Sequence, residues 1–144
     1  MDDKFWAVLS NGKFVEANSW DDLQKMLVAY KENVKMYIAR YYYRPYITQY
    51  GNSYYWPHFQ ILDKRGNARP YKRGRFKIIN INPDFGSYYF KHRRLTILDY
   101  KTREITEHLM YNECHDAKLF YNDLLVLLAE LEPVSYTHLR AHET

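Results

Sequence analysis

The 144-residue chain contains only one cysteine, five glycines and five prolines, and it has no long apolar run. With Cys114 alone, no disulfide can form within the chain, and the composition suits a reducing compartment. The low glycine and proline content argues against a fibrous repeat or a disordered chain. No apolar stretch approaches the ~20 residues of a transmembrane helix and no secretory signal follows Met1, so we expect a cytoplasmic protein.

Charge is distributed unevenly along the chain. The stretch from Met36 to Arg94 holds twelve of the 21 lysines and arginines but only two of the 17 acids, which gives it a formal charge of +10. The rest of the chain carries −6, so the overall +4 conceals a strongly cationic middle between acidic flanks. The same stretch holds eleven of the sixteen tyrosines. This polarity favours an anionic partner.

The last eleven residues, Val134–Thr144, resemble one reading frame of a transposase-based sequencing adapter. The resemblance implies that the native gene was cut near Pro133 and that it came from shotgun, metagenomic DNA. We therefore expect a single α+β domain over residues 1–133 and a disordered, non-native tail over residues 134–144.

Turn residues and apolar alternation predict a series of strands and two helices. Asn11-Gly12 is the preferred pair for a two-residue hairpin turn, and Ser19 is a good helix N-cap. Pro45 should end a strand or place it at a sheet edge. The expected strands span residues 4–9, 13–17, 34–43, 53–62, 75–81, 88–93, 95–100 and 103–109, and the expected helices span residues 20–33 and 114–131.

Strands outnumber helices in this order, and most connections are too short for parallel crossovers. We therefore predict an α+β fold: a single twisted, mainly antiparallel sheet with two helices packed on one face. The apolar stripe of the second helix should comprise Leu119, Phe120, Leu124, Leu127, Leu128 and Leu131.

The basic and aromatic middle of the chain is the strongest candidate for a binding site. Lysine and arginine supply most of the affinity for phosphates, and aromatic rings stack on unpaired bases. Arginine also suits phosphate forks and stacking better than lysine does. The candidate residues are Arg40, Tyr42, Arg44, Tyr54, Lys64, Arg65, Arg69, Tyr71, Lys72, Arg73, Arg75, Arg93 and Arg94.

These residues predict a small non-enzymatic protein that engages nucleic acid, DNA or RNA, or a nucleoprotein complex. The metagenomic origin that the resemblance of the tail implies adds the hypothesis of an anti-defence, anti-CRISPR-type factor from a phage or mobile element. Tyrosine and arginine also dominate protein–protein hot spots, so a protein-directed inhibitor or adaptor on an acidic protein surface stays open. A further alternative is that the tyrosines fill sheet surfaces and the cations pair with the acids of the flanks.

Two short motifs give a weaker alternative. Pro57-His58-Phe59-Gln60 resembles the His-hydrophobic-Gln metal motif of rolling-circle replication initiators, the HUH-like nucleases, and Tyr88-Tyr89-Phe90-Lys91 resembles their Tyr-x-x-Lys motif. The resemblance implies that His58 and Gln60 would face a divalent metal and that Tyr88 would attack a DNA phosphate. The family's tyrosine lies on a helix, whereas residues 88–91 have the pattern of a strand.

Other chemistry has little support in the sequence. Cys114 and His115 are adjacent and lack a second pair at zinc-binding spacing. No glycine-rich phosphate loop, Ser-His-Asp spacing or paired-carboxylate motif stands out. We therefore expect no catalytic residue, no metal site and no cofactor.

Overall fold

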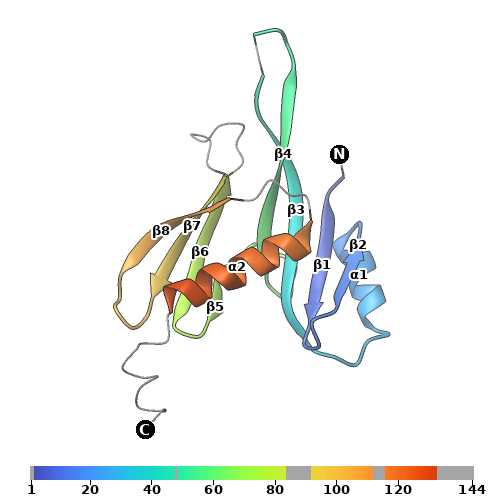
Figure 1. Cartoon of the computed structure of the whole chain (residues 1–144). Coiled ribbons are helices and arrows are strands. Elements are labelled where there is room, and N and C mark those ends of the chain that lie inside the picture. Colours follow the sequence, from blue (N-terminus) through green and yellow to red (C-terminus); the bar gives the residue numbers. More distant parts are fainter. Residues whose placement is uncertain (1, 48, 84–91, 112–115, 133–144) are drawn as a thin grey trace.

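The computed structural model describes residues 2–47, 49–83, 92–111 and 116–132, with ten helices and strands in the order ββαββββββα (Figure 1). The proposed tail and Cys114 lie outside the described residues. The elements are β1 (Lys4–Leu9), β2 (Phe14–Ala17), α1 (Trp20–Leu27), β3 (Val34–Ile47), β4 (Ser53–Leu62), β5 (Tyr71–Arg73), β6 (Phe76–Pro83), β7 (His92–Asp99), β8 (Ile105–Tyr111) and α2 (Ala117–Leu131).

The strands form two antiparallel sheets of four strands each. The first has the order β2-β1-β3-β4 and the second has the order β5-β6-β7-β8. The α+β class is confirmed, but the prediction of a single sheet is wrong. Residues 63–70, between β4 and β5, form a short hairpin with the end of β4 through the Leu62–Ala68 bridge, and β5 then pairs with β6 instead of β4.

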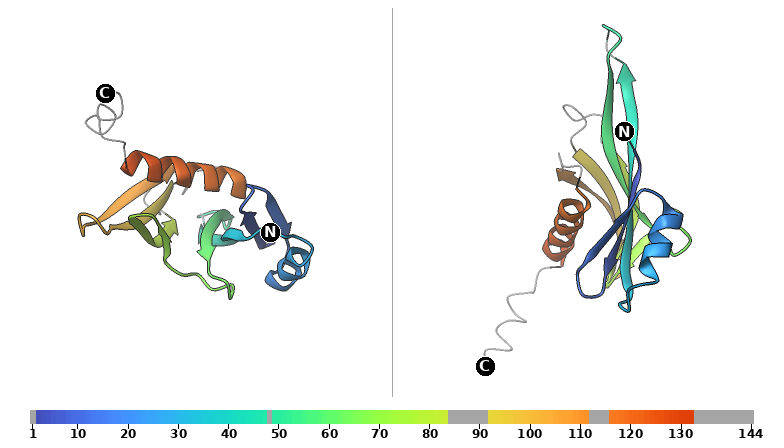
Figure 2. Two further views of the ribbon diagram at one scale, coloured as in Figure 1. Left: turned by 90° about the horizontal axis from the view of Figure 1, so that it is seen from below. Right: turned by 90° about the vertical axis from the view of Figure 1, so that its right-hand side faces the viewer.

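The two helices lie on opposite faces of the first sheet, which corrects the prediction that both pack on one face (Figure 2). Trp6 and Val8 of β1 belong to the cluster that includes α2, whereas Ala7 and Leu9 belong to the cluster beneath α1. All four side chains are buried. Because successive side chains of a strand point to opposite faces, a continuous buried run requires cover on both sides.

Helix α2 lies across both sheets and supplies the largest shared core (Figure 1). Its Phe120, Leu124 and Leu128 pack with Phe59 of the first sheet and with Leu95 of the second. The predicted stripe is therefore confirmed at these three positions of the helix. It is wrong at Leu119, which is 46% exposed.

Near the N-terminus the hairpin and the helix cap are confirmed, but the prediction of a two-residue turn is wrong. The backbone N–H of Leu9 bonds to the Lys13 carbonyl, so three residues, Ser10 to Gly12, form the loop. Gly12 adopts a positive φ of 87° in the turn between β1 and β2. The Ser19 hydroxyl accepts a hydrogen bond of 3.1 Å from the backbone N–H of Asp22, as an N-cap does. The helix that follows ends at Leu27, six residues before the predicted end.

Strand β3 continues past Pro45 to Ile47, beyond its predicted end. Its pairing with β4 shifts register between Tyr43 and Tyr46, which accommodates the proline. Pairing with β1 stops at Arg40, so the outer part of β3 has β4 as its only paired strand among the described residues. A missing backbone N–H is tolerated at such an edge.

Candidate functional site

The predicted cations do not form one exposed face. Arg93 on β7 is 0% exposed, and its guanidinium donates a hydrogen bond to the backbone carbonyl of Pro57 on β4. Burial lowers the pKa of Arg93 to about 10. Arg93 shares the buried face of β7 with Leu95 and Ile97, so the prediction that it lies on an open binding surface is corrected.

Arg40 lies among aromatic rings on β3. Its guanidinium carbon is 5.4 Å from the centroid of the Trp6 ring and 5.0 Å from that of Tyr42. These are cation–π distances, and both Arg40 and Tyr42 are half-buried. The side chains of Arg44 and Tyr54 lie outside the described part of the structure.

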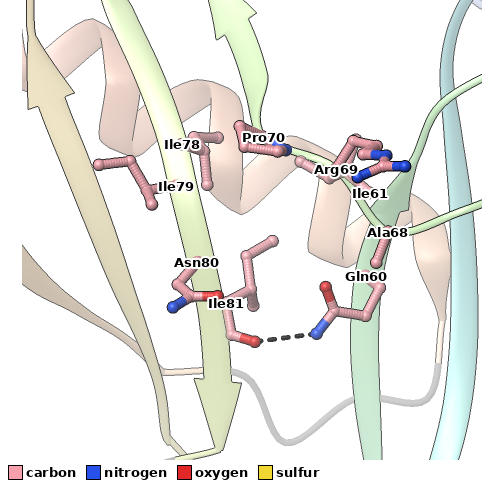
Figure 3. A pocket seen from close by; sticks show the side chains of 9 residues that line it. All are labelled: Gln60, Ile61, Ala68, Arg69, Pro70, Ile78, Ile79, Asn80 and Ile81. Atoms are coloured by element: carbon pink, nitrogen blue, oxygen red, sulfur yellow. Dashed lines mark hydrogen bonds between the residues drawn. The ribbon is translucent and has the colours of Figure 1, made fainter.

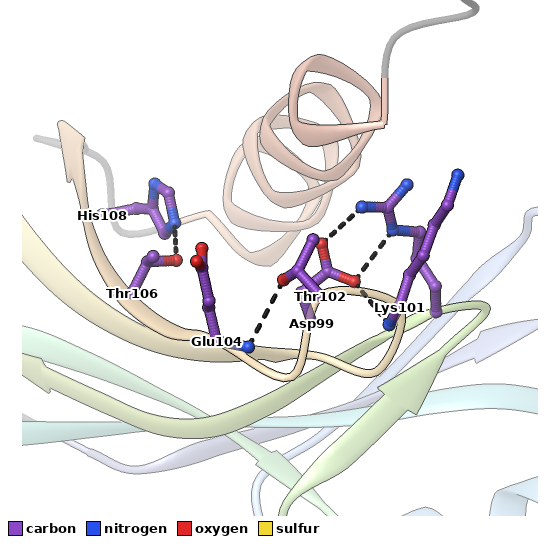
Figure 4. A network of polar contacts seen from close by, with 7 residues as sticks. Asp99, Lys101, Thr102, Glu104, Thr106 and His108 are labelled. Carbon is purple, nitrogen blue, oxygen red and sulfur yellow. Dashed lines mark hydrogen bonds and ion pairs between the residues drawn. The ribbon is translucent and has the colours of Figure 1, made fainter.

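Two further predicted arginines are paired with carboxylates of the second sheet. Arg75 makes a two-pronged contact with Asp99, with nitrogen–oxygen distances of 3.0 and 2.5 Å. Asp99 also accepts a 2.9 Å hydrogen bond from the backbone N–H of Lys101 (Figure 4). The hydrogen bonds from Arg75 lower the pKa of Asp99 to about 2. Arg94 lies 2.8 Å from Glu107 across β7 and β8. The guanidinium groups of Arg75 and Arg94 are therefore already paired with carboxylates of the same chain.

The remaining candidates come together in residues 63–77, which we call the basic segment. It contains seven cations and one acid, Asp63. It begins after β4, continues through β5 and ends in β6, so it connects the two sheets. Its exposed cations are Lys64, Arg65, Arg69, Lys72 and Arg73, and Tyr71 is half-buried against the core.

Asp63 organises the turn at the start of the basic segment. One of its carboxylate oxygens accepts hydrogen bonds from the backbone N–H groups of Arg65, at 2.8 Å, and Asn67, at 3.0 Å. The other oxygen lies 3.3 Å from Nε of Arg69. These interactions lower the pKa of Asp63, and the hydrogen bond from the Asn67 backbone has the largest effect. The turn therefore presents Lys64 and Arg65 to solvent in a fixed loop.

Gly66 fixes this turn against helix α1. It has a positive φ of 86°, and a Cβ built there would be 2.9 Å from the ring of Trp20. The same ring meets Tyr37 edge-on at a centroid distance of 4.7 Å. A side chain at position 66 would thus be strained in its backbone and would displace a packed indole.

We therefore expect Gly66→Ala to lower the free energy of unfolding by about 1–3 kcal/mol, since both backbone strain and the contact with Trp20 oppose the new methyl group. Urea unfolding measures this loss. Gly74→Ala is the matched control, because its φ is also positive, at 58°, but its Cβ would meet open space. Equal losses in the two variants would show that the contact with Trp20 contributes nothing.

Strands β5 and β6 bring two lysines face to face. Lys72 and Lys77 are directly opposite in the antiparallel register. Like charges in this position destabilise a sheet, so an anion between them would relieve a repulsion present in the free protein. The Lys72 ammonium also lies 4.7 Å from the centroid of the exposed Tyr100 ring. Sequence reasoning missed Lys77 and Tyr100 as neighbours of Lys72, because only the strand register reveals them.

A pocket of about 250 Å³ lies beneath the basic segment, between β4 and β6 (Figure 3). The Gln60 side chain reaches from β4 to β6 and donates a 3.0 Å hydrogen bond to the Ile81 carbonyl. Gln60 and Arg69 both line the pocket. A second hollow of about 680 Å³ includes Lys35, Lys64 and Tyr71 in its lining. Lys64 and Arg69 therefore border hollows as well as open solvent.

His58 and Gln60 are in contact through their side-chain nitrogens, as expected for residues on one face of β4. His58 is 1% exposed, and burial, with a smaller effect of Arg93, lowers its pKa to about 4. A neighbouring guanidinium disfavours a divalent cation at the imidazole. Tyr88, the nucleophile implied by the resemblance to replication initiators, lies outside the described residues.

Within the described ranges, no three His, Cys, Asp or Glu side chains gather as a metal site would require. In the same part of the chain, neither helix has the length and apolar character needed to cross a bilayer. Comparison of the sequence and structure with protein-family models, curated proteins and solved structures finds no match. The chain is thus placed by its architecture alone, as a two-sheet α+β protein with a basic connection between the sheets.

Proposed function

We propose that the chain is a binding protein whose basic segment captures nucleic acid, either free or in a nucleoprotein complex. The observation that carries the proposal is the concentration of exposed cations in this one connection, where Asp63 is the only acid and the exposed cations are Lys64, Arg65, Arg69, Lys72 and Arg73. Lys72 opposite Lys77 adds a pair of like charges that a phosphate would stabilise. Tyr100 beneath Lys72 offers a ring on which an unpaired base can stack.

The paired and buried arginines have no part in this capture. Arg75 and Arg94 are bound to carboxylates, and Arg93 supports the contact between the two sheets. The proposed site is therefore smaller than the whole cationic stretch of the sequence. An anti-defence role in a phage or mobile element is compatible with such a site, through guide RNA, target DNA or an acidic protein face.

The test is a fluorescence titration of labelled single-stranded and double-stranded DNA and RNA over a series of salt concentrations. A variant with Lys64, Arg65, Lys72 and Arg73 changed to alanine should bind more weakly. Its plot of log affinity against log salt concentration should become shallower by about three for single strands, because four phosphate contacts are lost.

A matched control removes four exposed lysines from other surfaces: Lys13, Lys25, Lys31 and Lys118. Both variants lower the formal net charge of +4 by four, so only the position of the charge differs. If the two variants lowered the affinity equally, the attraction to nucleic acid would depend only on net charge, and the proposal would be wrong. Binding that ignores salt, or that needs a protein partner, would instead support a protein-directed inhibitor or adaptor.

A further inference from the structure

Strand β8 is the last strand of the second sheet, and no helix or strand among the described residues pairs with its outer side (Figures 1 and 2). It pairs with β7 without a register shift from His92–Tyr111 to Leu98–Ile105. Proteins usually protect such an edge with charged side chains, especially lysine, with proline or with a bulge. The seven residues of β8, Ile-Thr-Glu-His-Leu-Met-Tyr, include neither lysine nor proline, and their one acid, Glu107, is paired with Arg94.

The face of this sheet that points away from α2 is also open among the described elements. The register places Leu98 beside Ile105 and Arg94 beside Leu109, on the side opposite the buried residues of β7. Ile105 is 62% exposed and Leu109 is 56% exposed. Two large apolar side chains thus lie in solvent on an edge strand.

Charge on this face is balanced within the protein. Glu107 lies between the two apolar residues in sequence, and its carboxylate is 2.8 Å from the Arg94 guanidinium. The patch formed by Ile105, Glu107 and Leu109 therefore has little attraction for a polyanion and little repulsion for a molecule of the same net charge. This balance favours a second copy of the chain over nucleic acid as the occupant.

We propose that two copies of the chain associate through their β8 strands, which pair antiparallel about a two-fold axis at Glu107. Ile105 and Leu109 are each two residues from Glu107, so this register places Ile105 of each copy opposite Leu109 of the other. The two Glu107 residues then lie opposite each other, and the ion pair of each with its own Arg94, at 2.8 Å, offsets the repulsion of these like charges. The same patch thus serves both partners, as a two-fold interface requires. The product is one continuous sheet of eight strands.

The dimer leaves the basic segment accessible. The strand order places β5 at the far edge of its sheet, with β6 and β7 between it and β8. The continuous sheet would therefore carry one basic segment at each end. Dimerisation and nucleic-acid capture are independent proposals, because they use opposite edges of the same sheet.

Sedimentation equilibrium of the full chain over a concentration series tests the association. The expected mass approaches twice the 17.6 kDa of one chain. Ile105→Lys should return the protein to a monomer, since it places a charge against an apolar side chain at two symmetric positions. Leu119→Lys, on the exposed side of α2, should leave the dimer intact. A wild-type chain that stays monomeric throughout would overturn the proposal.

Cysteine cross-linking tests the register. In a Cys114→Ser background, Glu107→Cys should give a covalent dimer on mild oxidation, because the two side chains meet at the axis. Ile105→Cys should not, because its two copies lie about 14 Å apart along the strands in this register. Efficient cross-linking at position 105, or none at position 107, would overturn the proposed pairing.

Discussion

Phe120→Ala is expected to lower the free energy of unfolding by about 3–5 kcal/mol. The Phe120 side chain is fully buried, and its ring stacks on that of Phe59 with centroids 4.7 Å apart and planes 12° apart. Truncation removes buried apolar surface and leaves a cavity between α2 and β4, which the surrounding sheets are too rigid to fill. The loss is measured as a lower urea midpoint at an unchanged slope.

This effect should be specific to the side of α2 that faces the sheets. Leu119 is the adjacent residue but is 46% exposed, so Leu119→Ala should change the free energy of unfolding by about 1 kcal/mol or less. A domain of this size has a total stability of roughly 5–15 kcal/mol, so the Phe120 variant should be close to unfolding on warming. Similar losses at the two positions would contradict the described placement of the helix.

The sequence predicts local structure well in this chain because the determinants are local. Asn11-Gly12 specifies a hairpin without help from the rest of the fold, although the loop has three residues and only Gly12 takes a positive φ. Ser19 and the two aspartates after it specify a helix start in the same way. The end of that helix lacks a comparable signal, and the predicted end at Asn33 was six residues too late.

The number of sheets and the sides of the helices depend on contacts between distant residues. Trp6, Ala7, Val8 and Leu9 are all buried, which only a strand covered on both faces allows. That unbroken apolar run was visible in the sequence and could have indicated helices on opposite sides. The short β5 was hidden within a basic stretch, because Tyr-Lys-Arg lacks the pattern of a buried strand.

The candidate site was predictable only in its charge. Composition located the cations, but ion pairs join Arg75, in the turn between β5 and β6, to Asp99 of β7, and Arg94 of β7 to Glu107 of β8. No local pattern in the sequence reveals such partners. Arg93 is different, because alternation along one strand places it with Leu95 and Ile97. The sequence-based interpretation broke the strand at Arg94 and lost this register, whereas β7 continues through that residue.

The stability of the protein should fall by about 3 kcal/mol as the pH is lowered from about 6.5 to about 4, because of His58. Burial, with a smaller effect of Arg93, lowers its pKa in the folded protein to about 4 from a model value of 6.5. In this window the unfolded chain binds a proton that the folded protein does not, so lower pH favours unfolding. The pKa of Arg93, about 10, keeps its charge constant throughout.

Urea midpoints measured at several pH values between 7.5 and 4.5 test this expectation against two controls. His58→Gln removes the titrating group and should flatten the profile, whereas His108→Gln, at an imidazole bonded to the Thr106 hydroxyl at 2.7 Å, should preserve the slope. Asp99 cannot produce the same slope, because its pKa falls from 3.8 to about 2 and its stabilisation is lost only at lower pH. If the pH dependence of the urea midpoint were unchanged in His58→Gln, the imidazole would not be held neutral beside Arg93. Water would then reach the contact between β4 and β7 where these two side chains lie.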